Sequence, residues 1–289
     1  MVKKLFISIL LFCSIGLFGQ GNRFAGFGYK STCDADAQIF IDSTRAKDTV
    51  QIRAICTLVK QLKDSSLWNS MKAIYPFVGG SATVDTLDRY RFNLKDPRYY
   101  VTAPNAAYCL VYAGGATSTI LGLKGNGANS YANTSFIPAY NFDSIQGNSF
   151  GAVIVNNIDA VQLPMGIRPS GSGNALSFST RISNIAYSGN VGAQLSVTNT
   201  DARGIYISTR TNRSTSKLFR NGTLLINNGA YVPDAYTKPI YLLARNYVNN
   251  PEFIITNTIG FAFIGSALTD AQASTLYNII NTFKNTLGR

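Results

Sequence analysis

The sequence predicts a mainly β protein, an antiparallel jelly-roll sandwich with helices before it and one helix after it. Charged residues make up only 14% of the 289 residues, well below the roughly 25% usual in soluble domains. From about residue 79 onward, short runs of alternating apolar and polar residues are separated by Gly, Asn, Ser and Pro, a pattern typical of β-sandwiches. Before that point and near the C-terminus, apolar residues recur every three or four positions, which indicates helices.

The first 19 residues have the pattern of a secretory signal peptide. Lys3 and Lys4 precede an apolar stretch that ends in small residues. The stretch is shorter than the about 20 apolar residues that a membrane-spanning helix needs; a retained anchor is the alternative. We therefore expect cleavage near residue 19, no stable membrane span afterwards, and a secreted, extracellular or virion location. Residues 20–78 are then expected to form a helical segment, and 79–289 the sandwich with its closing helix.

Helices are expected at three places. Residues 49–62 place apolar side chains at spacings of three and four, with Asp48 or Thr49 as the cap. Residues 67–77 (LWNSMKAIYPF) are expected to form a further helix that a proline ends. The closing helix begins at Thr269, where Thr-Asp-Ala-Gln fits a capping box.

The strands are expected between clusters of turn residues. The clearest turn is Asn221-Gly222, because a type I′ hairpin turn needs two residues that accept a positive φ. The expected strands are 109–113, 150–158, 176–182, 194–197, 204–210, 217–220, 223–226, 240–244 and 259–264.

Three cysteines follow the signal peptide, Cys33, Cys56 and Cys109. Because three is an odd number, at most one disulfide forms within the chain, and the sequence leaves its pairing open. Cys56 lies on an apolar helical face and is expected to be an ordinary core residue. The spacing of the cysteines matches no metal motif.

The residue inventory excludes much of hydrolytic chemistry. The chain has no histidine. This excludes catalytic Ser-His-Asp and Cys-His relays, and it excludes metal sites with histidine ligands. A retaining glycosidase needs two carboxylates roughly 5 Å apart, but Glu252 is the only glutamate and stands in an expected loop behind a proline. The close pairs Asp34/Asp36 and Asp85/Asp88 lie outside the expected strands. We therefore expect no enzyme, with a glycosidase as the disfavoured alternative, and no cofactor; calcium is left open.

Two parts of the chain resemble known families. The ending at 259–289 (IGFAFIGSALTDAQASTLYNIINTFKNTLGR), preceded by the hairpin KLFRNGTLL, resembles the final strand and closing helix of concanavalin A-like, laminin-G-like sandwiches. The run at 54–82 (AICTLVKQLKDSSLWNSMKAIYPFVGGSA), followed by FNLKDP at 92–97 and NGANSYANT at 126–134, resembles structural or tail-associated proteins of bacteriophages of Bacteroidetes hosts. The resemblance implies a jelly-roll module of virion structure or host adhesion.

Two departures qualify what the resemblance implies. Where relatives carry a Tyr-Ser-Arg-like strand, this chain has GAVIVN at 151–156, so no binding role is assigned to that strand. A secretion signal is also unusual for a virion component. An exported bacterial or prophage-derived carbohydrate-binding protein is therefore one alternative, and a purely structural decoration protein of the virion is another.

The expected function is contact with cell-surface polysaccharide through the loops of the sandwich, or packing against other virion proteins or further copies of the chain. The net charge is +12, and a basic cluster near the predicted hairpin suits acidic polysaccharide, although it also suits protection of a strand edge.

Nucleic acid is not expected, because the charge is dispersed and no binding motif is present. Tyr rings and Asn amides in the distal loops suit sugars. The predicted ligand-binding residues are Tyr206, Arg210, Arg213, Asn228, Tyr231, Asn246 and Tyr247.

Overall fold

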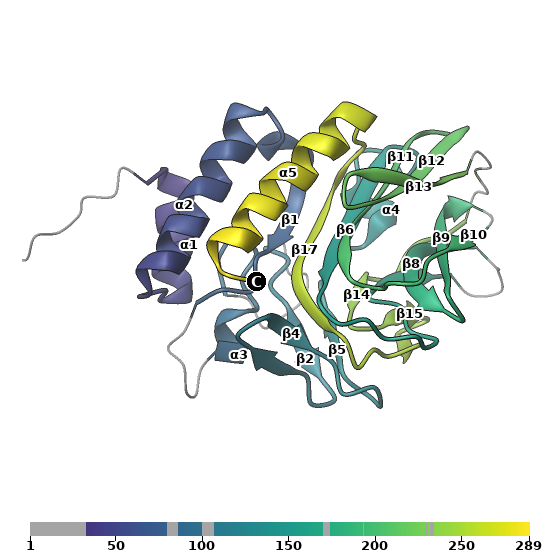
Figure 1. Cartoon of the computed structure of the whole chain (residues 1–289), viewed down its shortest axis with the longest axis horizontal. Coiled ribbons are helices and arrows are strands. Elements are labelled where there is room, and N and C mark those ends of the chain that lie inside the picture. The colour runs from purple at the N-terminus through teal and green to yellow at the C-terminus, as the bar shows by residue number, and fades with distance from the viewer. Residues whose placement is uncertain are drawn as a thin grey trace, which may run out of the picture. The chain divides into compact units, whose positions relative to one another are not determined.

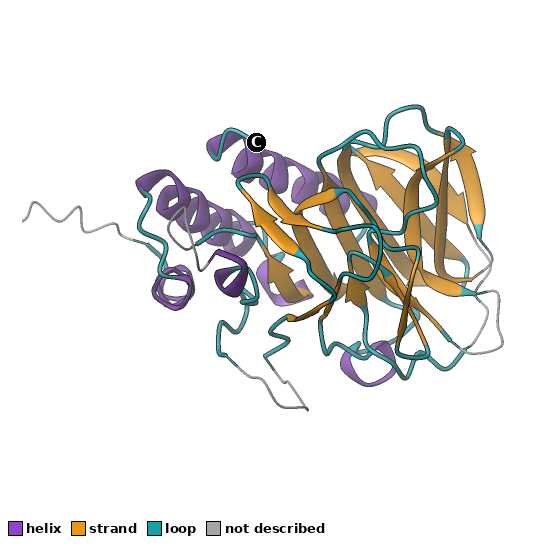
Figure 2. Ribbon diagram, turned by 90° about the horizontal axis from the view of Figure 1, so that it is seen from below, coloured by secondary structure: helices purple, strands orange, loops and turns teal. Residues whose placement is uncertain are grey.

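Two β-sheets face each other across an apolar core, with helices on the outer side of one of them (Figures 1 and 2). This computed structural model describes residues 33–79, 86–99, 107–169, 174–192, 194–228, 231 and 234–289. The predicted signal peptide at 1–19 lies outside the described residues. Within them, the predicted β-sandwich with helices before it and a closing helix is confirmed.

The first sheet, which we call the helix-covered sheet, has eight strands in the described part of the chain. Their order is β13 (Thr223–Asn228), β12 (Thr215–Arg220), β11 (Gly204–Asn212), β6 (Asn148–Ile154), β17 (Thr258–Ser266), β4 (Gly122–Lys124) and β3 (Thr117–Thr119), with β1 (Met71–Tyr75) also paired to β17. All neighbours are antiparallel. Asn221 and Gly222 join β12 to β13 with φ of 50° and 78°, which confirms the predicted type I′ turn.

The second sheet, which we call the open sheet, has nine strands within the described residues. Their order is β10 (Leu195–Thr198), β9 (Ile185–Gly192), β8 (Ala175–Ile182), β7 (Met165–Arg168), β14 (Tyr241–Leu242), β5 (Tyr131–Asn133) and β2 (Val111–Ala113). The strand β15 (Arg245–Tyr247) lies parallel to β7 and antiparallel to β16 (Asn250–Glu252). Every strand predicted from the sequence overlaps an observed one.

Three long helices cover the outer face of the first sheet (Figure 1). They are α1 (Ala35–Thr44), α2 (Thr49–Asp64) and α5 (Asp270–Thr286). Asp48 caps α2, and Thr269 and Gln272 form the predicted capping box of α5. Shorter helical turns are Trp68–Ser70, α3 (Thr86–Arg89) and α4 (Pro138–Asn141). No described helix is both long and apolar enough to span a membrane.

The predicted helix at 67–77 is wrong. Only Trp68–Ser70 makes a helical turn, and Met71–Tyr75 forms β1 at the edge next to β17. Ala73 and Tyr75 enter the sandwich core, whereas Ile74 packs under the helices. Because both faces of β1 are buried, its sequence lacks the polar alternation that marks a half-exposed strand, and tertiary packing decides the conformation.

A disulfide joins Cys33 to Cys56, with a Cα–Cα distance of 5.2 Å. It ties the residue before the N-cap of α1 to the middle of α2. The expectation that Cys56 is an ordinary core residue is therefore wrong, although its half-buried side chain does pack against the apolar layer of the helices. The Cys109 thiol lies buried in the sandwich.

Candidate functional site

A hollow of about 260 Å³ lies on the outer face of the open sheet. Its floor contains Ser177, Ser179 and Gly189, on strands β8 and β9. Side chains alternate along a strand, so these residues point away from the core that Leu176 and Phe178 enter. Three small residues surrounded by larger ones leave a depression in the sheet.

Two arginines stand on the same outer face beside this floor. Arg245 on β15 is level with Gly166 of β7, and Tyr247 is level with Arg168. The register therefore places both guanidinium groups and the Tyr247 ring on one side of the sheet. The remaining wall is made by Val161, Leu163, Tyr187, Gln194 and Phe253.

Arg245 is a buried cation with one acidic partner. It is only 7% exposed, and its Nη2 donates to Glu252 Oε2 at 2.7 Å. Its guanidinium carbon lies 4.7 Å from the ring centre of Phe253. Burial lowers the pKa of Arg245, the hydrogen bond and charge of Glu252 raise it, and the positive charge of Arg168 lowers it again. The Nε of Arg245 is buried with no acceptor in the described structure.

Arg168 adds a second positive charge with no acidic partner among the described residues. Its guanidinium carbon lies 4.6 Å from the ring centre of Tyr247, and its Nε is also buried without an acceptor. A buried N–H group without a partner costs about 1–3 kcal/mol. Of the two guanidinium groups, only that of Arg245 has a carboxylate partner, and an anion bound beside Arg168 would supply the missing negative charge.

The backbone around these residues is unusual. β15 and β16 are joined by Val248 and Asn249, with φ of 50° and 69°, and the next loop residue, Phe253, has φ of 52°. Positive φ is unfavourable for β-branched and bulky residues. Such local strain is found where the surrounding structure holds a residue for a function. Phe253, which is 39% exposed, lies against Arg245.

The residues predicted from the sequence do not form one site. Tyr206 is fully buried, with its ring 5.6 Å from that of Phe178, and its hydroxyl accepts a hydrogen bond from Asn199. Asn246 is also buried and fixes its own turn, because its Nδ2 donates to Pro239 O at 2.8 Å and its Oδ1 accepts from Asn249 N at 2.7 Å. Neither side chain has surface to offer a ligand.

Arg210 is buried as well, which corrects its predicted place in an exposed loop site. Its Nε donates to Asn190 O at 2.6 Å, so it holds β11 to the opposite sheet. Arg213 and Tyr231 do meet, with the guanidinium carbon 5.6 Å from the ring centre. Asn228 ends β13, and its side chain lies outside the described residues.

The sequence analysis missed Arg168, Arg245 and Phe253, and placed Glu252 in a loop, whereas it ends β16. The sequence did contain a signal for this site. Residues two positions apart on a strand lie on the same face, and both Arg245 with Tyr247 and Asn250 with Glu252 have this spacing. No group of three or more His, Cys, Asp or Glu residues suited to a metal ion occurs in the described part of the chain.

Comparisons with known proteins show resemblance at the level of the fold. No protein-family model and no curated protein matches this sequence. Among solved structures, the NanB sialidase of Streptococcus pneumoniae is similar at 12% identity and a TM-score of 0.42, over 57% of this chain and 27% of that one. Trypanosoma rangeli sialidase is similar at 10% identity and a TM-score of 0.45, over 78% and 39%.

A third similar structure is of botulinum neurotoxin type C, whose cell entry is described as dependent upon interaction with two ganglioside molecules. It matches at 11% identity and a TM-score of 0.48, over 75% of this chain and 53% of that one. The chain thus spans between about a quarter and a half of the length of these proteins. Similarity this low transfers neither residue roles nor activity.

One prediction is corrected by these comparisons. The sequence analysis expected no enzyme, but sialidases recur among the similar structures, and the prediction is wrong as stated. The scarcity of acidic residues and the absence of histidine exclude particular catalytic relays and do not exclude enzymes as a class. We assign no reaction to the chain.

Proposed function

We propose that the protein recognises an anionic saccharide in the hollow on the open sheet. The observation that carries this proposal is the pair of guanidinium groups of Arg168 and Arg245. Only Arg245 is paired with a carboxylate, that of Glu252, and the Nε of each arginine is buried without an acceptor among the described residues. Guanidinium groups bind carboxylate, sulfate and phosphate through parallel hydrogen bonds. Arg168 could make such parallel hydrogen bonds with an anion. Among the described residues, none accepts a hydrogen bond from its Nε, and none is an acid that pairs with it.

The rest of the hollow suits a sugar ring. Phe253 and Tyr187 present aromatic surface at its wall, on which the C–H face of a sugar can pack. Ser177 and Gln194 supply hydroxyl and amide groups nearby. A small number of polar groups among aromatic walls is the usual composition of a small-molecule site.

The decisive experiment separates charge from sugar. Polygalacturonate and its fully methyl-esterified form share a backbone, but only the first carries carboxylates. We expect the purified protein to bind the acidic polymer and to bind the ester much more weakly, as measured by affinity electrophoresis and calorimetry; a glycan array extends the test to other acidic sugars. Equal binding of neutral and acidic glycans, or no acidic ligand on the array, contradicts the proposal. Release of reducing ends in the same samples distinguishes turnover from binding.

Matched variants locate the site. Arg168→Gln removes the guanidinium without disturbing an ion pair, and a charge-assisted hydrogen bond is worth about 1.5–3 kcal/mol, so affinity should fall roughly tenfold or more. Arg213→Gln removes the same charge at the exposed cluster with Tyr231, predicted from the sequence, and should leave affinity unchanged. The opposite result would place the ligand at that cluster instead.

We also propose export of the chain. The disulfide between Cys33 and Cys56 supports this, since disulfides persist in oxidising compartments. An intact mass beginning near residue 20 in the secreted fraction is the expected result, and a full-length mass retained in the cytoplasm contradicts it.

A role in a virion rests on the sequence resemblance alone. We propose it as the setting in which an adhesive sandwich would act, with other virion proteins or further copies of the chain as neighbours. Mass spectrometry of purified particles from the source organism tests it: the chain is expected among the particle proteins, and its absence there contradicts this role.

A further inference from the structure

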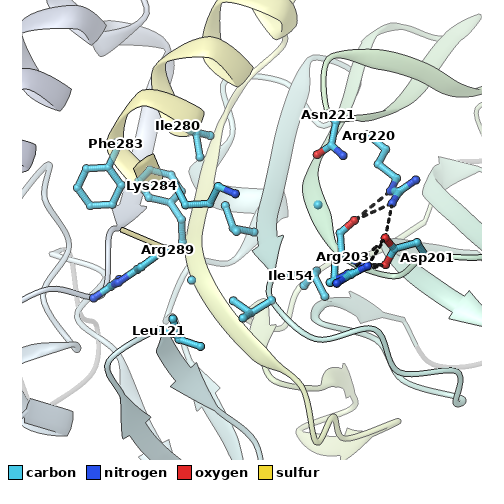
Figure 3. A pocket seen from close by; sticks show the side chains of 15 residues that line it. Leu121, Ile154, Asp201, Arg203, Arg220, Asn221, Ile280, Phe283, Lys284 and Arg289 are labelled. Carbon is cyan, nitrogen blue, oxygen red and sulfur yellow. Dashed lines mark hydrogen bonds and ion pairs between the residues drawn. The ribbon is translucent and has the colours of Figure 1, made fainter. Parts of the chain in front are cut away.

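A second hollow, also of about 260 Å³, lies between the C-terminal half of α5 and the outer face of the helix-covered sheet (Figure 3). Its inner surface is apolar. Val153 and Phe261 come from the sheet, and Ile280 and Phe283 come from the helix. Each of these side chains is at most 5% exposed, and the rings of Phe261 and Phe283 meet edge to face at 5.6 Å. This surface belongs to the apolar layer that attaches the helices to the sheet.

The rim of this hollow is strongly basic. Its cationic side chains belong to Arg203, Arg220 and Lys284, and one acidic side chain, Asp201, lies among them. Arg289 also lines the hollow, but its Nη1 donates to Phe77 O at 3.2 Å. Asp201 is already engaged: its Oδ1 lies 3.0 Å from Arg203 Nε, and its Oδ2 lies 3.6 Å from Arg220 Nη2 (Figure 3). These contacts hold the pKa of Asp201 below its ordinary value, mainly through the hydrogen bond from Arg203. One carboxylate therefore balances only part of the positive charge.

The position of Arg220 is fixed by the backbone. Its Nε and Nη2 donate to Arg203 O at 3.1 and 2.9 Å, which joins the end of β12 to the start of β11. The guanidinium is thereby held at the mouth of the hollow before any ligand arrives. A group that is positioned in advance loses less freedom on binding.

Lys284 approaches from the opposite side. Figure 3 shows its side chain extending from α5 toward β17 and the hollow. In the described structure its ammonium group has no ion-pair partner. A lysine in the last turn also stabilises the helix dipole, so a purely structural role is the alternative that the test must separate.

We propose that this hollow binds a small amphipathic anion, a free carboxylic acid with a short apolar chain or ring. The apolar surface would take up the chain, and Lys284 and Arg220 would face the carboxylate across the mouth. The volume corresponds to roughly nine liquid waters at about 30 Å³ each, which fits a molecule of about that many non-hydrogen atoms and is too small for a lipid with two chains. This site is separate from the proposed saccharide site, which lies on the other sheet.

Three probes test the chemistry on the intact protein: octanoate below its micelle concentration, acetate and octanol. Burial of a methylene strengthens binding about fourfold, so we expect octanoate to bind at least tenfold more tightly than acetate. Octanol, which lacks the charge, should also bind at least tenfold more weakly than octanoate. Acetate binding as tightly as octanoate reduces the site to an unspecific anion patch and overturns the proposal, as does octanol binding as tightly.

Variants test the residues. Lys284→Gln should weaken octanoate binding about tenfold, and Lys284→Arg should keep it. Lys60→Gln, which removes an exposed lysine from α2, is the matched control and should bind octanoate like the wild type. A merely structural Lys284 would lower the melting temperature in the glutamine variant while leaving octanoate affinity unchanged, and that result contradicts the proposal. Leu121→Trp, which fills the hollow from the β3–β4 turn, should abolish octanoate binding and leave polygalacturonate binding intact.

Discussion

In both sheets, alternate side chains along each strand point to the outer face, but one outer face is apolar and covered by helices and the other is polar and uncovered. On the helix-covered sheet the outward side chains include Ile205, Ile207 and Phe263. They belong to the apolar layer under the helices, in which α5 packs on β11 and α2 packs on α5. On the open sheet the outward positions hold Ser177, Arg168 and Arg245. Covering an apolar outer face is favourable because it removes apolar surface from water. The polar outer face gains nothing from such a cover and stays accessible. The proposed saccharide site therefore lies on the sheet that lacks helices.

Removal of an apolar side chain from the covered face should have the largest effect. Phe263 is 1% exposed and lies between β17 and the helices. Phe263→Ala should lower the free energy of unfolding by about 3–5 kcal/mol, because it leaves a cavity, as measured by urea denaturation. Val161→Ala on the open face, where Val161 is 55% exposed, should change it by no more than about 0.5 kcal/mol. Similar losses at both positions would break the comparison.

The disulfide should contribute the next largest effect, because it fastens the helical cover. The crosslinked residues are 23 positions apart, and closure of such a loop is worth about 3 kcal/mol. Cys56→Ala and Cys33→Ala should each lower the free energy of unfolding by about this amount, and the double variant should be no worse than either single one. Additive losses would show that the two side chains stabilise the fold independently of the bond.

The charged side chains of the open face should show an asymmetry. Glu252→Gln leaves Arg245 buried without its carboxylate, and should lower the free energy of unfolding by about 1–3 kcal/mol. Arg168→Gln removes a like charge next to Arg245 and a buried Nε without an acceptor, so it should leave stability unchanged or raise it. A large loss in Arg168→Gln would mean that this arginine stabilises the fold, which would weaken the case that it is held for a ligand.

A pH dependence is expected on the covered side. Lys95 lies over the Trp68 ring, with its Nζ 3.8 Å from the ring centre, and burial lowers the pKa of Lys95 to about 8. Asp36 opposes this shift, and Lys63 and Lys72 add to it. Between pH 8 and the ordinary lysine pKa near 10.5, the unfolded chain binds more protons than the folded one, so stability contributed by this group rises with pH.

Lys95→Met isolates this effect. Burial raises the pKa of Tyr75 and of Tyr112, which destabilises the folded state above about pH 10 in both proteins. Urea denaturation at pH 7.5, 8.5 and 9.5 should therefore show the wild type gaining stability relative to the variant as pH rises. A constant difference between the two proteins would disprove the assigned titration.

The sequence predicted best what depends on local chemistry. Asn221-Gly222 identified its hairpin because two residues that tolerate positive φ stood together, and Thr269 with Gln272 identified the start of α5. The hairpin of β15 and β16 uses the same two positive φ angles, but at Val248 and Asn249. A β-branched residue is a poor signal for such a turn, so the hairpin that carries Arg245 and Glu252 was missed, and the candidate site with it.

Two strands, β1 and β9, were missed for different reasons: β1 depends on a distant partner, and β9 has a weak local signal. β1 is a strand because β17 lies beside it, although the two are almost 190 positions apart. β9 (IAYSGNVG) contains too many small and polar residues for a strand signal, yet it pairs with β8 along most of its length. The hollow depends on these small residues, because Gly189 and Ser177 face each other across the two strands and their small size leaves a depression.

The place of β17 in the sheet has a consequence for biosynthesis. β17 pairs with β1, β4 and β6. These three strands are synthesised before β17, so they cannot complete their pairing until β17 has been made. Until residue 266 has emerged, the nascent polypeptide presents unpaired strand edges, the kind of species that chaperones bind. The same delay would suit the proposed export, because a secretory translocon accepts an unfolded polypeptide.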